Sequence, residues 1–144
     1  MFDVDQTSMS YGIGDRYFWA WGLTDFGNAT FQGFAHGLSR LWISELWPYD
    51  SSEDSFVKRI QSIFTGTKFL TRKDGSLEEA FPNEGSYCVT ALVAFDLLVS
   101  IDLLSEKIND VQRQEFIEIV RPLIIYLKKS DETHAIISNH LATA

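Results

Sequence analysis

The stretch from residue 87 to residue 104 constrains this chain most, because it is apolar nearly all the way round a helix. Its only polar residues are Thr90, Asp96, Ser100 and Asp102. A helix without a broad polar face buries most of its surface, so we expect residues 87–104 to lie inside a helical assembly. The stretch approaches membrane-spanning length, but two aspartates within it would be costly in hydrocarbon. We therefore expect a soluble core helix and no membrane insertion.

Helical periodicity on both sides of this stretch predicts an all-α fold of antiparallel helical hairpins with essentially no sheet. The first helix is expected over residues 29–46, and Ser51 or Ser52 caps a second that ends at Gly66. The connection that follows is expected to be a loop. The inner helix is predicted over residues 85–106, a fourth over 111–129 and the start of a fifth at Ser138.

The chain reads as a single helical domain over residues 1–144. It divides into an irregular aromatic segment (1–27), a first hairpin (28–70), a second hairpin (71–130) and the start of a third (138–144). Asn28, Asn83 and Asn139 each follow an apolar residue by two positions at a helix start, and they lie 55 and 56 residues apart. Stacked helix pairs bury their faces only against neighbours. We therefore expect an unfinished apolar edge, formed by the fourth helix and the segment after Ser138, and either a homo-oligomer or a missing C-terminal portion.

The charge of the chain narrows its partners and its compartment. A net charge of −8 with scattered basic residues argues against nucleic acid, which needs clustered Lys and Arg. Cys88 is the single cysteine and reads as a small buried hydrophobe. The first residues lack the basic and apolar regions of a signal peptide, so a cytoplasmic location is expected.

Three segments resemble bacterial α/α-toroid proteins, the rings of helical hairpins that include six-hairpin glycosidases, heparinase-like lyases and squalene-cyclase-like folds. The segments are DRYFWAWGLTDFGNATFQGFAHGLSRL (15–41), DGSLEEAFPNEGSYCVTALVAF (74–95) and ISNHLATA (137–144). The nearest likeness is to cytoplasmic toroid proteins associated with surface-polysaccharide synthesis. A full ring needs about six hairpins, and this sequence stops earlier. The resemblance implies part of a toroid that binds or processes carbohydrate, as a glycoside hydrolase or a polysaccharide lyase if it is an enzyme.

The resemblance also implies that polar residues at the inner helix starts line a substrate rim. His140 beside Asn139 suits proton transfer next to a neutralised carboxylate, and Glu84 suits the acid or base of glycoside hydrolysis. The candidate set is Glu84 and His140 for catalysis, and Trp19, Trp21, Asp25, Asn28, Asn83, Tyr87 and Asn139 for substrate binding.

Each of these residue types also has an ordinary structural use. Asn139 can cap a helix, Glu84 can interact favourably with a helix N-terminus, and the tryptophans can pack in a core. Gln32, His36 and Arg40 form a polar row, four residues apart, that faces either a cavity or water. The alternative to carbohydrate chemistry is therefore a non-catalytic helical-repeat module that docks a partner or self-associates.

No cofactor or metal is indicated by the sequence. The three histidines and the single cysteine lack the close spacing of a metal site. Glycine loops that bind phosphate and the nucleophile elbow of hydrolases are also missing from the sequence. We therefore expect no cofactor, and a saccharide is the ligand to test.

Overall fold

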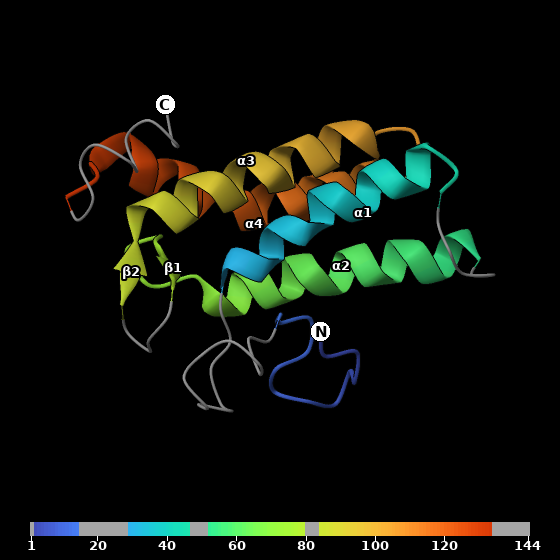
Figure 1. Cartoon of the computed structure of the whole chain (residues 1–144), viewed down its shortest axis with the longest axis horizontal. Coiled ribbons are helices and arrows are strands. Elements are labelled where there is room, and N and C mark those ends of the chain that lie inside the picture. The colour runs from blue at the N-terminus through green and yellow to red at the C-terminus, as the bar shows by residue number, and fades with distance from the viewer. Residues whose placement is uncertain (1, 15–28, 47–51, 80–83, 134–144) are drawn as a thin grey trace.

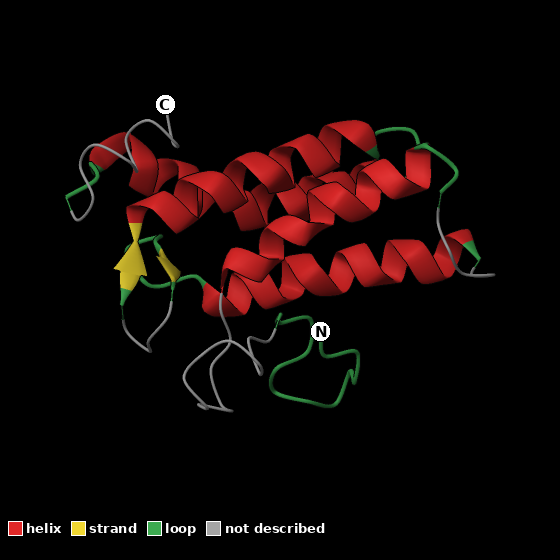
Figure 2. Cartoon of the chain, viewed as in Figure 1, coloured by secondary structure: helices red, strands yellow, loops and turns green. Residues whose placement is uncertain are grey.

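The computed structural model describes residues 2–14, 29–46, 52–79 and 84–133, and most of them lie in helices (Figure 2). In chain order the elements are the 3-10 helix η1 (Ala29–Gly33), α1 (Phe34–Ile43), α2 (Glu53–Leu70), β1 (Leu77–Glu78), β2 (Gly85–Ser86), α3 (Tyr87–Leu103) and α4 (Asp110–Lys129). The predicted helical class is confirmed for this part of the chain. The fifth helix, predicted from Ser138, lies outside the described residues, as does the predicted segment 15–27.

The helices alternate in direction along the chain. Figure 1 shows α1 and α3 running side by side in the same sense, with α2 and α4 running the opposite way. The side chains agree with this arrangement. His36 near the start of α1 contacts Asp96 in the middle of α3, and Trp42 near its end shares a cavity with Asp102. Two successive helix pairs therefore present their odd-numbered helices in parallel.

Capping side chains begin three of the helices. Ser52 accepts a hydrogen bond from the backbone N–H of Ser55 at α2, and Ser86 accepts one from Val89 at α3. At α4, Asn109 and Gln112 bond each other's backbone N–H groups in a capping box. The two predicted N-terminal boundaries at residues 52 and 111 are therefore correct to within one residue.

Gly66 was predicted to end the second helix, and this prediction is wrong. The helix continues to Leu70, and Gly66 lies inside it where the N-terminal segment crosses. A Cβ at Gly66 would lie 2.4 Å from the backbone of Gly12. The glycine is therefore needed for close approach of two backbones, with the helix passing through it unbroken.

The connection between α2 and α3 was predicted to be a loop, and this is wrong for part of it. Leu77 pairs with Ser86 and Glu78 with Gly85 in an antiparallel ribbon of two residues per strand. The predicted start of the inner helix at residue 85 is likewise wrong, because Gly85 and Ser86 belong to this ribbon and α3 begins at Tyr87. Before β1, Gly75 adopts a positive φ of 93° in a turn pressed against α4, where a Cβ would lie 2.4 Å from the carbonyl oxygen of Pro122.

The core lies between α2, α3 and α4 and is rich in stacked rings. Phe64 of α2 stacks on Phe116 of α4 with ring centroids 4.0 Å apart, and Trp42 of α1 stacks on Phe56 of α2 at 4.4 Å. Both α3 and the ribbon contribute to the same core through Leu97 and Leu77. Among the described helices, none has the length and apolar content needed to cross a membrane.

Residues 2–14, the described part of the irregular N-terminal segment, pack on η1 and α2. The side chain of Gln32 holds the segment in place. Its Nε2 donates to the carbonyl oxygens of Gly12 (3.0 Å) and Ile63 (2.7 Å), and its Oε1 accepts from the N–H of Gly14 (2.9 Å). Gln32 is fully buried, so a single amide side chain ties the N-terminal segment to two helices.

Candidate functional site at the α1–α3 surface

Most of the predicted site residues lie outside the described part of the chain. These are Trp19, Trp21, Asp25, Asn28, Asn83, Asn139 and His140. The convergence of the three asparagines on one rim therefore stays a prediction. Only Glu84 and Tyr87 of the candidate set are described.

Glu84 and Tyr87 lie at the ribbon and at the start of α3. Glu84 is exposed, and its carbonyl oxygen accepts a hydrogen bond from the N–H of Glu79. Tyr87 is half-buried with its ring 6.3 Å from that of Tyr126, and burial raises the pKa of the Tyr126 phenol. The backbone hydrogen bond brings Glu79 beside Glu84, and glycoside hydrolysis uses a pair of carboxylates.

The polar row Gln32, His36 and Arg40 divides into two parts. Gln32 is enclosed and serves the fold, whereas His36 and Arg40 reach the surface between α1 and α3. His36 Nδ1 lies 2.8 Å from Oδ1 of Asp96, and Arg40 Nε donates to His36 Nε2 at 2.7 Å. Three side chains from two helices thus form one chain of hydrogen bonds.

The protonation state of His36 in this chain follows from its partners. A guanidinium Nε–H only donates, so the Nε2 of His36 that receives it must carry a lone pair. The proton of the neutral imidazole is then on Nδ1, which donates it to Asp96. The side chain of His36 is 19% exposed and that of Asp96 is 31% exposed, so solvent still reaches both groups.

The packing around this chain of hydrogen bonds fixes Asp96 and the imidazole ring. A Cβ at Gly33 would lie 2.5 Å from Oδ2 of Asp96, so a larger residue there would displace the carboxylate. The ring of Phe95 meets the imidazole edge to face, with centroids 6.3 Å apart. An oriented imidazole with a carboxylate behind it is the arrangement that general bases use. Here Arg40 occupies the nitrogen that would accept the proton.

The surface around His36 is apolar, which is the second feature of the site. We define the outer face as five exposed apolar residues of α1 and α3: Phe34 (55% exposed), Leu41 (38%), Leu92 (42%), Phe95 (61%) and Leu98 (43%). Gly37 lies among them on α1, with open space where its Cβ would be. The expectation that residues 87–104 turn no broad face to water is wrong, because Leu92, Phe95 and Leu98 of α3 are exposed.

The sequence reading missed Asp96 as a functional residue, although a signal was present. Asp96 is one of four polar residues in an apolar helix, and three of these, Thr90, Asp96 and Ser100, form hydrogen bonds within the fold. The hydroxyl of Thr90 donates to the carbonyl oxygen of Ser86, the cap residue before α3, and that of Ser100 donates to the carbonyl oxygen of Asp96. The partly buried carboxylate of Asp96 needs a partner from another helix, and His36 of α1 supplies it.

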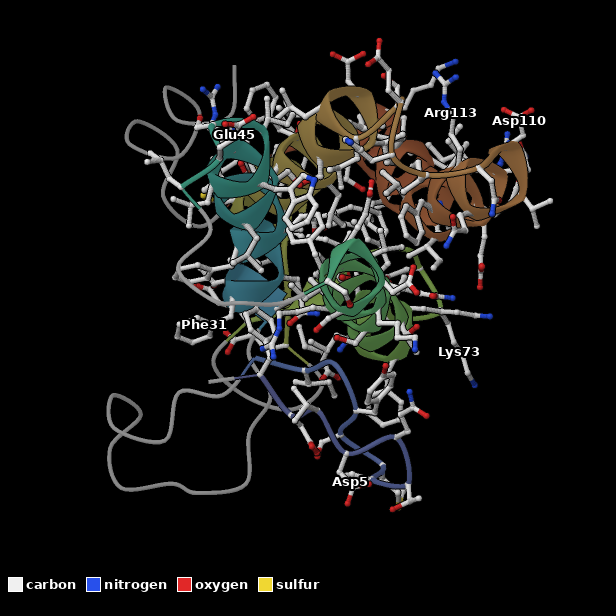
Figure 3. The ribbon with its side chains drawn as sticks, turned by 90° about the vertical axis from the view of Figure 1, so that its right-hand side faces the viewer. Asp5, Phe31, Glu45, Lys73, Asp110 and Arg113 are labelled. Atoms are coloured by element: carbon white, nitrogen blue, oxygen red, sulfur yellow. The ribbon has the colours of Figure 1, made fainter. Side chains whose placement is uncertain are left out.

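A cavity of about 610 Å³ lies at the far end of the same two helices. Trp42 and Glu45 line it from the α1 side, and Asp102 and Lys107 from the α3 side. Glu45 has a positive φ of 56° and follows the C-cap of α1, where the N–H of Leu46 bonds the carbonyl oxygen of Leu41. This is a Schellman motif with glutamate at the position that favours glycine. Figure 3 shows Glu45 at this end of α1.

Two other groups bear on the chemistry of the described residues. Cys88 is half-buried, and burial raises the pKa of its thiol, so it is a poor nucleophile near neutral pH. Within the described ranges, no three His, Cys, Asp or Glu side chains are grouped as metal ligands would be.

Comparisons with known proteins gave no relative. No model of a protein family matched the chain, no curated protein matched it, and no solved structure was found to be similar. Function must therefore be argued from the residues and contacts described above.

Proposed function

We propose that this chain is a helical interaction module that pairs with a second copy of itself through the outer face. The observation that carries the proposal is the outward side of α3. Leu92, Phe95 and Leu98 lie there at helical spacing, and Phe34 and Leu41 are exposed on α1, which packs against α3. Large exposed apolar patches on a folded domain are typical of docking sites.

A second copy is favoured by the charges beside this face. Arg40 on α1 and Asp102 on α3 are both exposed. A twofold contact places the same surface on both partners, so it needs both signs of charge on one surface to be self-complementary. Arg40 of one subunit would then meet Asp102 of the other. The hydrogen bond of Arg40 to a neutral imidazole leaves its positive charge available for such a pair.

Sedimentation velocity over a range of protein concentrations tests the proposal. We expect the wild-type chain to form dimers as concentration rises and Phe95→Glu to stay monomeric. Val111→Glu is the matched control, because Val111 is 78% exposed on α4 and outside the outer face. A wild-type chain that stays monomeric throughout, or equal loss of dimer in the two variants, would contradict the proposal.

Exchanging the charges of Arg40 and Asp102 tests whether the partner is a second copy of the chain. Arg40→Asp and Asp102→Arg should each weaken the dimer, and the double variant should recover it because the pair is restored with opposite polarity. Failure of the double variant to recover would rule out the twofold pairing. Dimers that form equally well in wild type, Arg40→Asp and Asp102→Arg would also rule out this pairing.

Saccharide binding or processing is the second candidate, and the His36–Asp96 contact is the observation that favours it. An imidazole oriented by a carboxylate, with an exposed phenyl ring at Phe95 and a guanidinium at Arg40, offers a base, a stacking surface and a carboxylate-binding group. This candidate also retains the resemblance to toroid proteins of polysaccharide metabolism. It requires Arg40 to leave His36 Nε2 when an acidic sugar binds.

Binding of neutral and uronate oligosaccharides, measured by calorimetry, tests this candidate. His36→Ala should abolish binding if the α1–α3 surface is the site, whereas Glu84→Gln and His140→Ala should abolish it if the predicted rim is the site. If Asn139 is only a helix cap, Asn139→Ala lowers stability by about 1 kcal/mol and His140→Ala changes nothing. Absence of saccharide binding by the wild-type chain would end this candidate.

A further inference from the structure

Arg72 lies just after α2, and among the described residues one nitrogen of its guanidinium group has no hydrogen-bond partner. Its Nε is buried and, among the described residues, has no hydrogen-bond partner. The carboxylate oxygen Oδ1 of Asp74 lies 3.9 Å from Nε, beyond hydrogen-bonding distance. That oxygen already accepts from the N–H and the hydroxyl of Ser76, at 3.0 and 2.7 Å. A buried donor without an acceptor is rare in folded proteins and calls for an explanation.

The surroundings of Arg72 form a cavity between α2 and α4. Its volume is about 420 Å³, and Lys68, Thr71 and Lys73 line it together with Arg72. Ile119 and Pro122 of α4 provide apolar surface opposite them. Lys73 is seen in Figure 3 on the side of the molecule where α2 faces α4. The cavity therefore combines three cations with a small apolar wall.

The charge balance of this cavity is the reverse of that of the chain. Three of the twelve basic residues fall within the six positions 68–73, in a chain of net charge −8. Glu115 and Glu118 also line the cavity. Glu118 is bound by Arg121, whose Nε and Nη2 donate to its two oxygens at 2.9 and 2.8 Å. With Arg121 counted, and with Asp74 counted because it lies 3.9 Å from Arg72, four cations face three carboxylates.

We propose that this cavity is a binding site for an anionic group, with Arg72 as its principal donor. The chemistry that fits is a carboxylate or a phosphate on a small molecule, because a guanidinium binds either through paired N–H donors. Ile119 and Pro122 would contact the apolar part of the ligand, such as a sugar ring. The site is separate from the outer face on α1 and α3, so it does not depend on dimerisation.

Nuclear magnetic resonance titration of the full chain at low salt tests the site. The probes are inorganic phosphate, glucuronate and, as the uncharged control, glucose. We expect phosphate or glucuronate to shift the amide signals of Thr71, Lys73 and Ile119, and glucose to leave them unchanged. Raising the salt concentration should weaken the response, because ion pairing is screened. A response to glucuronate alone assigns a carboxylate ligand, and a response to phosphate alone assigns a phosphate ligand.

Three variants separate the site from a general effect of charge. Arg72→Met keeps most of the aliphatic stem and removes the donors, so binding should weaken at least about tenfold. Arg72→Lys keeps the charge and should retain part of the affinity. Arg113→Ala removes an exposed charge of α4 that does not line the cavity, and it should bind as wild type. Circular dichroism establishes that each variant is folded.

Three results would overturn the proposal. The first is the absence of any shift at Thr71, Lys73 and Ile119 with both anions. The second is binding that is equally strong in wild type and in folded Arg72→Met, because the anion would then lie elsewhere. Loss of binding in Arg113→Ala to the same extent as in Arg72→Met would likewise show only long-range charge attraction.

Discussion

The two ends of one polar row on η1 and α1 have opposite environments. Gln32 is enclosed, and each of its polar atoms bonds a backbone group of the N-terminal segment or α2. One and two turns later, His36 and Arg40 lie at the surface, where the exposed ring of Phe95 meets the imidazole. The molecule thus buries an amide and exposes phenyl rings within a few residues. Such an inversion supports the proposal that the outer face contacts a second copy of the chain.

The same contrast exists across α3, whose two sides have similar composition. Val93 and Leu97 are buried against the rest of the core, whereas Leu92 and Phe95 are exposed. Apolar content alone therefore does not tell which side of this helix the chain itself covers. Substitutions on the two sides should separate a residue that serves folding from one that serves association.

The largest expected difference is between two phenylalanines. Phe116→Ala should lower the free energy of unfolding by about 4 kcal/mol, because its ring is buried and stacked on Phe64. Phe95→Ala should change it by less than about 0.5 kcal/mol in the monomer, because most of its ring is already exposed. Urea denaturation at low protein concentration measures both. A loss of stability in Phe95→Ala as large as that in Phe116→Ala would show that the outer face belongs to the core.

The next effect concerns the enclosed end of the polar row. Gln32→Ala should lower the free energy of unfolding by about 3 kcal/mol, because it leaves two carbonyl oxygens and one N–H without this partner in a buried site. Hydrogen exchange should also become faster at the amide of Gly14, which donates to Gln32. Gln114→Ala, at an exposed site on α4, is the control and should change stability little. Equal stability of Gln32→Ala and wild type would contradict the role given to this side chain.

A smaller effect is expected at the exposed end of the row. A double-mutant cycle on His36→Ala and Asp96→Ala should give a coupling of about 1 kcal/mol or less, since solvent reaches both groups and screens the pair. A coupling of several kcal/mol would mean that the pair mainly stabilises the fold. If the coupling is negligible but the substitutions change dimerisation or saccharide binding, the His36–Asp96 pair serves function rather than stability.

The smallest effect concerns acid stability at the turn before the ribbon. Hydrogen bonds from the hydroxyl and the N–H of Ser76 hold the pKa of Asp74 below its ordinary value of 3.8. A carboxylate with a lowered folded-state pKa stabilises the fold above its unfolded pKa and loses that contribution as pH falls through the folded value. Ser76→Ala should therefore reduce the loss of stability between pH 5 and pH 2, by less than about 1 kcal/mol. Identical acid titrations of folding for wild type and Ser76→Ala would refute this.

The sequence was sufficient for the helices because their signals are local. Ser52 caps α2, and apolar residues at helical spacing define α4, so both were placed from neighbouring residues alone. Gly66 was misread because its reason lies in Gly12, more than fifty positions away. The ribbon was missed because Leu77–Glu78 is short and pairs only when α2 and α3 bring Gly85–Ser86 beside it.

The candidate site was less accessible to sequence reasoning than the fold. The row containing His36 and Arg40 was recognised, but its environment depends on Asp96, sixty positions later. The exposed side of α3 could not be told from the buried side, because both are apolar. The unfinished edge was expected on α4, where Val111, Ile124 and Ile125 are exposed, and the segment after Ser138 lies outside the described residues. Arg72 carried no signal at all, since an unpaired donor is a property of packing.

Dilution of the labelled chain, followed by nuclear magnetic resonance, tests the central claim most directly. The claim is that the outer face is covered by a second copy. On dilution, the signals of Leu92, Phe95 and Gly37 should shift toward a monomer limit, while those of Val111 and Gly75 stay constant. Constant signals at the outer face across all concentrations, or shifts confined to α4, would contradict it.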